Sequence, residues 1–194
     1  VFTFAVQGCL YSRHLDPELA EVKNTPYYHW VMMGLEGEGA YNPGDYEFTR
    51  SFTDPQERDN ALRKEIINRI SEKGVGGMAQ LYKAKIIRCI GNGTLGLSDF
   101  LDDNPKAESP LHQYILYSGS KYESYKRLCN IVFYSLLLLA AFYPVRSGRK
   151  ETEGFAPALA LCGIIVFLMH WETSPRYITN YVPVIILLAA GGVR

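Results

Sequence analysis

A carboxylate and a guanidinium stand four residues apart in His170-Trp171-Glu172-Thr173-Ser174-Pro175-Arg176-Tyr177, a short segment between two apolar runs. At this spacing Glu172 and Arg176 can form an ion pair, or Arg176 can present its planar set of donors to a phosphate group. Two interpretations are therefore open for this segment. The charged residues either bind an anionic ligand or only anchor the ends of the flanking helices.

Aromatic side chains gather in a second segment, Pro26 to Leu35, which contains His29 and Trp30. Aromatic rings beside a histidine and an acid such as Asp45 can form a platform for a sugar, because the apolar C–H face of a pyranose packs on Trp and Tyr rings. The alternative is that Trp30 and its neighbours only pack this segment onto other helices or onto a membrane. The sequence leaves both interpretations open.

Three apolar runs occupy the last third of the chain. They span Leu128–Val145, Gly154–His170 and Ile178–Val193, with 18, 17 and 16 residues and no Asp, Glu, Lys or Arg. A helix that crosses a hydrocarbon core of about 30 Å needs roughly 17 to 25 apolar residues. Because these runs are apolar on all sides rather than along one stripe, we predict three transmembrane helices.

Charge is distributed unevenly along the 194 residues, although 20 Lys and Arg balance 20 Asp and Glu. Residues 1–127 hold 32 of these charges and residues 128–194 hold 8. Three basic residues lie in the loop 146–153, which the positive-inside rule therefore places in the cytoplasm. By alternation of the helices, residues 7–127 are predicted to be extracytoplasmic. The lack of net basic charge argues against a nucleic-acid partner.

The opening residues 1–6, VFTFAV, are too short to cross a membrane. They are predicted to be the end of a transmembrane helix whose start is missing, so the chain is expected to be a fragment of a multi-pass protein. The predicted fold class is all-α. It comprises a helical and loop-rich extracytoplasmic segment at 7–127 and a membrane domain at 128–194, with helices at about 128–145, 154–170 and 178–193.

A helix start is predicted in the extracytoplasmic segment at Asp54-Pro55-Gln56-Glu57, with Asp54 as the N-cap and Pro55 in the first helical position. This helix should bury Leu62 and the isoleucines one and two turns later. It should end at Gly74.

A second, basic amphipathic helix is predicted from about Gly77 to Ile90, with Lys85 on its polar side. It would lie either on the membrane surface or against a small outer domain. The turn-rich stretches Gly34–Gly39 and Tyr41–Tyr46 are predicted loops.

The four cysteines form no CxxC pair and no metal-ligand spacing with the four histidines. We therefore predict no metal site and no cofactor, with a divalent cation as an open alternative. A disulfide between Cys9 and Cys89 is compatible with an extracytoplasmic location.

Two stretches resemble a family of bacterial multi-pass membrane glycosyltransferases. They are HWETSPRY ahead of YVPVIILLAAGG, and YYHWVMMGLEGEGAYNPGDYEFTRSF ahead of a helix of type ERDNALRKEIINRI. The broad group is similar to family 39 of the GT-C enzymes and includes protein O-mannosyltransferases and the lipid A aminoarabinose transferase. The pattern of Glu172, Arg176, Tyr177 and Pro183 recurs among these enzymes, and the stretch from His29 to Asn42 resembles a narrower Firmicutes subgroup.

The resemblance implies a plasma-membrane enzyme that moves a sugar from a polyprenyl-phosphate donor to a glycan or protein acceptor at the outer face. Its partners would be membrane lipids, that donor and that acceptor. The general base would lie in the missing N-terminal part, so this fragment should be inactive alone. The resemblance and the local chemistry together predict a set of donor-binding residues: Glu172, Arg176, Tyr177, His170, His29 and Trp30.

Two other classes of protein are alternatives. One is a non-catalytic membrane component of cell-surface polysaccharide assembly or export. The other is a transporter, which fits less well because the three runs contain no charged residue and no interrupted pair of half-helices. An acidic residue in a short first outer loop upstream, followed by further spans, would favour the enzyme.

Overall fold

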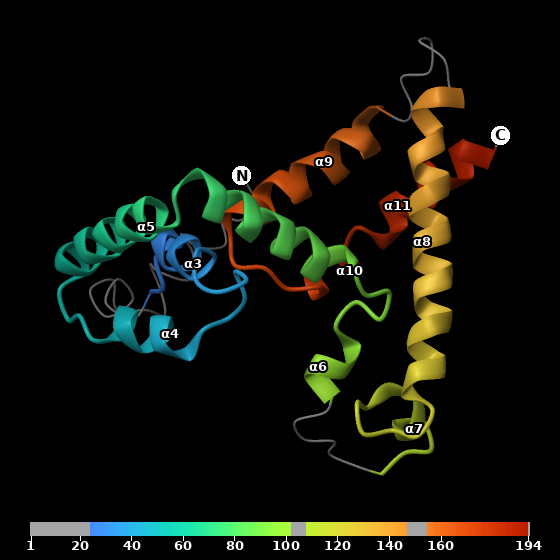
Figure 1. The fold of residues 1–194 in the computed structure, drawn as a ribbon, viewed down its shortest axis with the longest axis horizontal. Coiled ribbons are helices and arrows are strands. Elements are labelled where there is room, and N and C mark those ends of the chain that lie inside the picture. The colour runs from blue at the N-terminus through green and yellow to red at the C-terminus, as the bar shows by residue number, and fades with distance from the viewer. Residues whose placement is uncertain (1–23, 102–107, 147–154, 194) are drawn as a thin grey trace, which may run out of the picture.

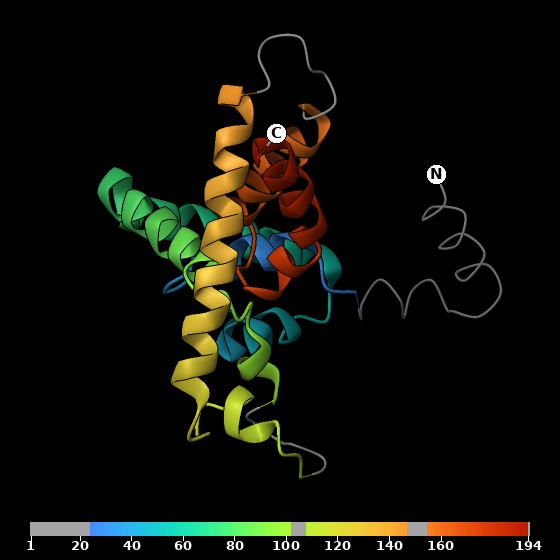
Figure 2. The same ribbon diagram turned by 90° about the vertical axis from the view of Figure 1, so that its right-hand side faces the viewer.

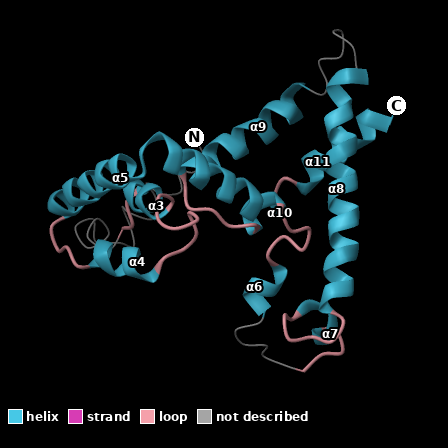
Figure 3. Ribbon diagram, in the orientation of Figure 1, coloured by secondary structure: helices cyan, strands magenta, loops and turns pink. Residues whose placement is uncertain are grey.

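The structure is a computed structural model that describes residues 24–101, 108–146 and 155–193, apart from the side chains of 144–146 (Figure 1). These residues form the helices α3 to α11, and Figure 3 shows no strand among them. The predicted all-α class is confirmed for this part of the chain. The predicted span end at 1–6 and the thiol of Cys9 lie outside the described residues.

Two short helices pack around one long helix. We refer to these three helices as the outer helices, from their place at the left edge of the fold in Figure 1. Helix α3 (Tyr27–Met33) packs against both α4 (Pro43–Arg50) and α5 (Pro55–Ile90), on the left of Figure 1. The Asp54 carboxylate accepts hydrogen bonds from the backbone N–H groups of the second and third residues of α5, both at 3.2 Å. These bonds satisfy donors that the first turn of a helix leaves free. The predicted start of this helix is confirmed.

Gly74 interrupts α5. Its backbone has φ 56° and ψ −171°, a conformation outside the helical region that glycine adopts at little cost. The two parts of α5 therefore meet at an angle, which is visible in Figure 1. The predicted break at Gly74 is confirmed, although the second part begins directly after it rather than at Gly77.

The predicted loop at Tyr41–Tyr46 is wrong, because α4 begins inside it. The Asn42 side chain accepts hydrogen bonds from the backbone N–H groups of Gly44 at 2.8 Å and Asp45 at 3.3 Å, and Pro43 takes the first helical position. Asn-Pro-Gly is typical of turns, but Asn is equally a strong N-cap and Pro suits the first helical residue. The predicted turns over Gly34–Gly39 are present.

The apolar helices form the right-hand part of Figure 1. Helix α8 (Tyr122–Arg146) stands upright, α9 (Phe155–His170) slants towards the centre, and α10 (Arg176–Thr179) leads into α11 (Val182–Val193), which packs along α8. In Figure 2 the end of α11 lies towards the same end of the fold as the end of α8. The C-terminal ends of α8 and α11 therefore lie towards the same end of the fold.

The prediction of three membrane spans is confirmed in part for the described residues. One helix is long and apolar enough to cross a membrane, over Tyr122–Tyr143, with 22 residues and a mean hydropathy of 1.3. Helices α9 and α11 are apolar but have 16 and 12 residues, which correspond to about 24 and 18 Å of helix. The third predicted run is divided, because two turn residues separate α10 from α11.

Among the described residues, an apolar core connects the end of α5 with the apolar helices. Its buried members come from α5, α8, α9, α10 and α11: Cys89, Phe133, Ala140, Leu168, Ile178, Ile185, Leu188 and Ala189. The second part of α5 is therefore packed into the same core as the apolar helices.

Candidate functional site

The candidate site lies where the chain leaves α9 and turns into α10, a place that we call the junction. The backbone N–H of Thr173 donates to the carbonyl oxygen of Gly39 at 2.6 Å. A side chain at Gly34 would overlap with the carbonyl of Trp171, so only glycine permits this approach. The rings of Trp30 and Trp171 stack with centroids 6.2 Å apart. The two segments identified in the sequence, 26–35 and 170–177, therefore lie side by side.

Glu172 is bound by a tyrosine rather than by an arginine. It is 2% exposed and accepts a hydrogen bond of 2.5 Å from the hydroxyl of Tyr177. Burial raises the pKa of Tyr177, and the bond to Glu172 raises it further, while Arg176 acts in the opposite direction. Of the two possibilities for Glu172 and Arg176, the ion pair is not formed between these two described residues. Glu172 is thus a buried acceptor whose partner is a phenol.

Arg176 lies at the exposed edge of the junction. Its guanidinium carbon is 5.2 Å from the centroid of the Phe100 ring and 5.3 Å from that of the Tyr177 ring. Both distances are within the range of cation–π contacts. The guanidinium is therefore placed between two aromatic side chains while remaining accessible from outside.

A buried lysine, absent from the predicted site, holds the end of α9. The Lys85 side chain is fully buried, and its Nζ donates to the carbonyl oxygens of Leu168 at 3.4 Å, Met169 at 2.9 Å and Trp171 at 2.8 Å. The last carbonyls of a helix lack partners within it and carry its negative dipole end, so they favour a cation. The prediction that Lys85 lies on a solvent-facing polar side is wrong.

The spacing of neighbouring residues contained a signal for this burial. Lys85 is four residues from Leu81 and four from Cys89, and both of these are buried. Residues at i, i+4 and i+8 share one helix face. Lys85 therefore belongs to the apolar face by position, whereas its charge suggested the polar one.

Burial shifts the titration of two groups at the junction. It lowers the pKa of Lys85 to about 8, against the opposing effects of Cys89 and Glu172. It raises the pKa of the Cys89 thiol to about 11, against Lys85 and Arg88. A thiol that stays protonated at neutral pH is a poor nucleophile. At the junction, Lys85 and Glu172 therefore hold the chain in place, and the thiol of Cys89 is not a reactive nucleophile.

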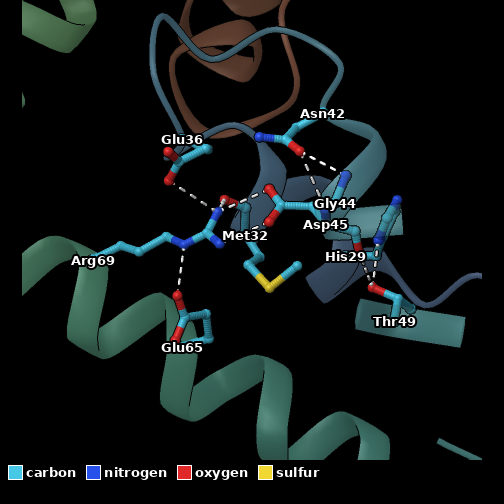
Figure 4. A network of polar contacts seen from close by, with 9 residues as sticks. All are labelled: His29, Met32, Glu36, Asn42, Gly44, Asp45, Thr49, Glu65 and Arg69. Carbon is cyan, nitrogen blue, oxygen red and sulfur yellow. Dashed lines mark hydrogen bonds and ion pairs between the residues drawn. The ribbon is translucent and has the colours of Figure 1, made fainter. Parts of the chain in front are cut away.

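A second, partly buried cation binds the outer helices together (Figure 4). The two terminal nitrogens of Arg69 donate to the two carboxylate oxygens of Asp45 at 2.8 and 2.7 Å, and its Nε donates to Glu65 at 2.9 Å. Arg69 also donates to the carbonyl of Met32 at 3.0 Å. Although burial opposes it, the bonds to Asp45 and Glu65 raise the pKa of Arg69 above its ordinary value. This cluster connects α3, α4 and the first part of α5.

The two histidines of the predicted site are held in different ways. His29 is fully buried, and its Nδ1 lies 2.6 Å from the hydroxyl of Thr49. Because that hydroxyl donates to the Asp45 carbonyl at 2.9 Å, the Nδ1–H of His29 is the donor. Burial lowers the pKa of His29, against the effect of Asp45. His170 is exposed, and its Nδ1 lies 3.0 Å from the carbonyl oxygen of Val166 in its own helix.

The structure therefore brings three of the predicted donor-binding residues to the junction, namely Trp30, Glu172 and Tyr177. Arg176 lies at its edge, and His170 ends α9. His29 lies behind Trp30, with the two rings 4.8 Å apart and edge to face, so it does not line an open surface. A part for any of these residues in donor binding stays a prediction.

One membrane-length helix, two shorter apolar helices and an attached helical segment define an all-α membrane protein. Residues 17–193 match the family described as conserved hypothetical integral membrane protein. Because this match covers most of the chain, the protein belongs to that family, and membrane lipids are its surroundings. No curated protein and no solved structure matches the chain.

Proposed function

We propose that the chain is part of a plasma-membrane glycosyltransferase that moves a sugar from a polyprenyl-phosphate donor to a glycan or protein acceptor at the outer face. The observation that supports this proposal is the position of Arg176. It is an accessible guanidinium that two aromatic rings flank at the start of α10, between the apolar helices α9 and α11. A lipid-linked phosphate would meet the protein at this boundary.

The surroundings of Arg176 suit a phosphate ligand. A cation–π contact engages the flat face of a guanidinium, so N–H groups along its edge can still form bonds to phosphate oxygens. Tyr177 flanks Arg176 and is itself fixed by the buried Glu172. In this proposal Glu172 is a positioning residue, and the general base belongs to a part of the protein outside this chain.

The placement of the chain ends supports an outer-face site. The junction lies at the end of α9 away from Phe155, the first residue of that helix, which follows the basic loop 146–153 in the sequence. Helix α11 returns towards the end of α8 (Figure 2). If the loop is cytoplasmic, as its basic residues favour, the junction faces the opposite side of the membrane.

The test is Arg176→Ala in the full-length protein. We expect transfer from a polyprenyl-phosphate sugar to fall by about one to two orders of magnitude, because hydrogen bonds to charged groups contribute about 1.5–3 kcal/mol. Arg176→Lys should also be impaired, because an ammonium cannot form the paired bonds of a guanidinium. Transfer would be measured in membranes with equal amounts of inserted protein. Arg127→Ala, which alters another exposed arginine, is the control, and unchanged transfer in Arg176→Ala would remove this residue from the site.

A non-catalytic component of polysaccharide assembly or export is the second candidate. Lys85 donates to a backbone carbonyl and Glu172 accepts from Tyr177, so both charged groups hold the chain together, which favours this candidate. Full-length protein that binds the lipid-linked sugar through Arg176 but transfers none of it to any acceptor would support this candidate over the enzyme.

A further inference from the structure

The second part of α5 carries a row of apolar side chains that is exposed at Val75 and reaches the edge of the apolar core at Ile90. Val75 is 91% exposed and Ile86 is 41% exposed, while Ala79 is exposed and Ile90 partly so. Positions 75, 79, 86 and 90 fall on one side of a helix with 3.6 residues per turn. We refer to these four residues as the outer stripe. The buried residues Leu81 and Lys85 lie on a different side of the same helix.

The outer stripe leads into an apolar cavity between α5 and α9. The cavity has a volume of about 140 Å³ and is partly open. Its lining comes from α5, α9 and α10, and every member is apolar: Ile86, Cys89, Ile90, Ile165, Leu168, Met169 and Ile178. A closed cavity of about 150 Å³ with such a lining stays dry and binds small apolar molecules. This cavity is therefore suited to a piece of hydrocarbon chain.

Helix α9, which adjoins the outer stripe, exposes apolar side chains that suit a lipid environment. The protein belongs to an integral membrane family, and α9 exposes large apolar side chains such as Leu159, Val166 and Phe167. Ile86 and Ile90 of the outer stripe line one cavity with residues of α9, so this end of the stripe adjoins α9. Figure 1 shows that α5 crosses the end of α9 rather than running parallel to α8. This is the arrangement of a helix at the membrane surface.

Charge beside the outer stripe matches lipid head groups. Lys83 is exposed and lies next to the stripe on the helix surface. Helices that lie in the membrane interface combine an apolar face with Lys or Arg beside it, because the cations attract anionic head groups.

We propose that the part of α5 after Gly74 binds phospholipid at the membrane surface. The outer stripe lies against the hydrocarbon, an acyl chain of a bilayer phospholipid enters the cavity between α5 and α9, and Lys83 lies beside the head groups. This lipid site is separate from Arg176, so its failure would leave the proposed sugar transfer untouched.

Photo-crosslinking in the full-length protein tests the outer stripe. The residue p-benzoylphenylalanine would be placed at Ile86 or, as the matched control, at the exposed polar residue Gln80 of the same helix. After irradiation of native membranes, mass spectrometry should find phospholipid adducts at position 86 in severalfold higher yield than at position 80. Equal yields, or a crosslink from position 86 to a polypeptide, would overturn the proposal.

A cavity-filling variant tests the acyl chain separately. Ile165→Trp places a larger side chain in the cavity, so the full-length protein purified in mild detergent should retain severalfold less phospholipid. Ala160→Trp, an exposed position on the same helix that does not line the cavity, should retain the parent amount. Native mass spectrometry measures both, on material that elutes as the parent protein does. Undiminished lipid in Ile165→Trp would overturn the occupation of the cavity.

Discussion

Arg69 and Lys85 are cations on the same helix, one on each side of the break at Gly74, and they are stabilised in different ways. Arg69 is partly buried and Lys85 is fully buried. Arg69 is paired with the carboxylates of Asp45 and Glu65. Among the residues that the structure describes, Lys85 donates to backbone carbonyls alone. Carboxylates compensate fully for burial and raise the pKa of Arg69, whereas carbonyl dipoles do not prevent burial from lowering the pKa of Lys85 to about 8.

The difference follows from what each cation connects. Arg69 joins α3, α4 and α5 within one helical segment, where the carboxylates of Asp45 and Glu65 lie close by. Lys85 joins that segment to the end of an apolar helix, where the free backbone carbonyls are the available acceptors. The outer helices are therefore held by ion pairs, and their attachment to α9 depends on a cation that is harder to keep charged.

The largest effect is expected from Arg69→Met. It leaves Asp45 buried without its cation, and removing one partner of a buried ion pair costs about 3–5 kcal/mol. Thermal or chemical unfolding of the full-length protein in detergent measures the loss. Lys64→Met, at an exposed position of the same helix, is the control. A loss no greater than that of Lys64→Met would show that the Arg69 cluster does not stabilise the outer helices.

Lys85→Met should have the next largest effect. The methionine fills similar space but leaves the carbonyls at the end of α9 without a donor, which should cost about 1.5–3 kcal/mol. The same unfolding measurement applies, with Lys83→Met as the exposed control on the same helix. If the two variants were equally stable, the three bonds from Lys85 would contribute nothing to the attachment of α9.

Two glycines allow a paired test of packing against Lys85. Gly37 and Gly39 have φ of 49° and 79°, so an alanine at either position is strained. Only at Gly39 would the added methyl group meet the Lys85 side chain. Gly39→Ala should therefore cost about 1 kcal/mol or more beyond Gly37→Ala. The excess should shrink in a Lys85→Ala background, and an excess that persists there would place its origin elsewhere.

The last prediction is a dependence of stability on pH. The pKa of Lys85 is about 8 in the folded protein and 10.5 as its ordinary value. Between these values the unfolded chain binds more protons at Lys85, so stability rises with pH; below pH 8 both states are protonated and this contribution is constant. The stability difference between the parent and Lys85→Met should therefore grow from pH 8 to 10.5 in thermal unfolding. A constant or falling difference would contradict the lowered pKa, and Arg69 variants should show no such trend.

Local signals in the sequence predicted the elements whose contacts are local. The Asp54 cap bonds reach only two and three residues along the chain, and the break at Gly74 needs only a glycine. The start of α4 was missed because Asn42-Pro43-Gly44 suits both a turn and a helix cap. The bond from Arg69 to Asp45, 24 residues away, stabilises the helical alternative.

The site was less predictable than the helices. The sequence placed Glu172, Arg176 and Tyr177 within one short segment, yet two partners of Glu172 were sterically available. In the folded chain Tyr177 binds it and Arg176 lies between aromatic rings. The choice depends on Phe100, which the sequence separates from Arg176 by most of the apolar region.

The amino-acid sequence by itself determined the all-α class, the membrane character, the start of α5 and its break at Gly74, because caps, breaks and apolar runs act over a few residues. Only the tertiary structure decided that Lys85 is buried and that the segments 26–35 and 170–177 lie together. The physical reason is the distance along the chain: Lys85 and the Trp171 carbonyl are 86 residues apart. The charge of Lys85 suggested a solvent-facing residue, but in the folded chain its buried ammonium group connects the outer helices to the end of α9.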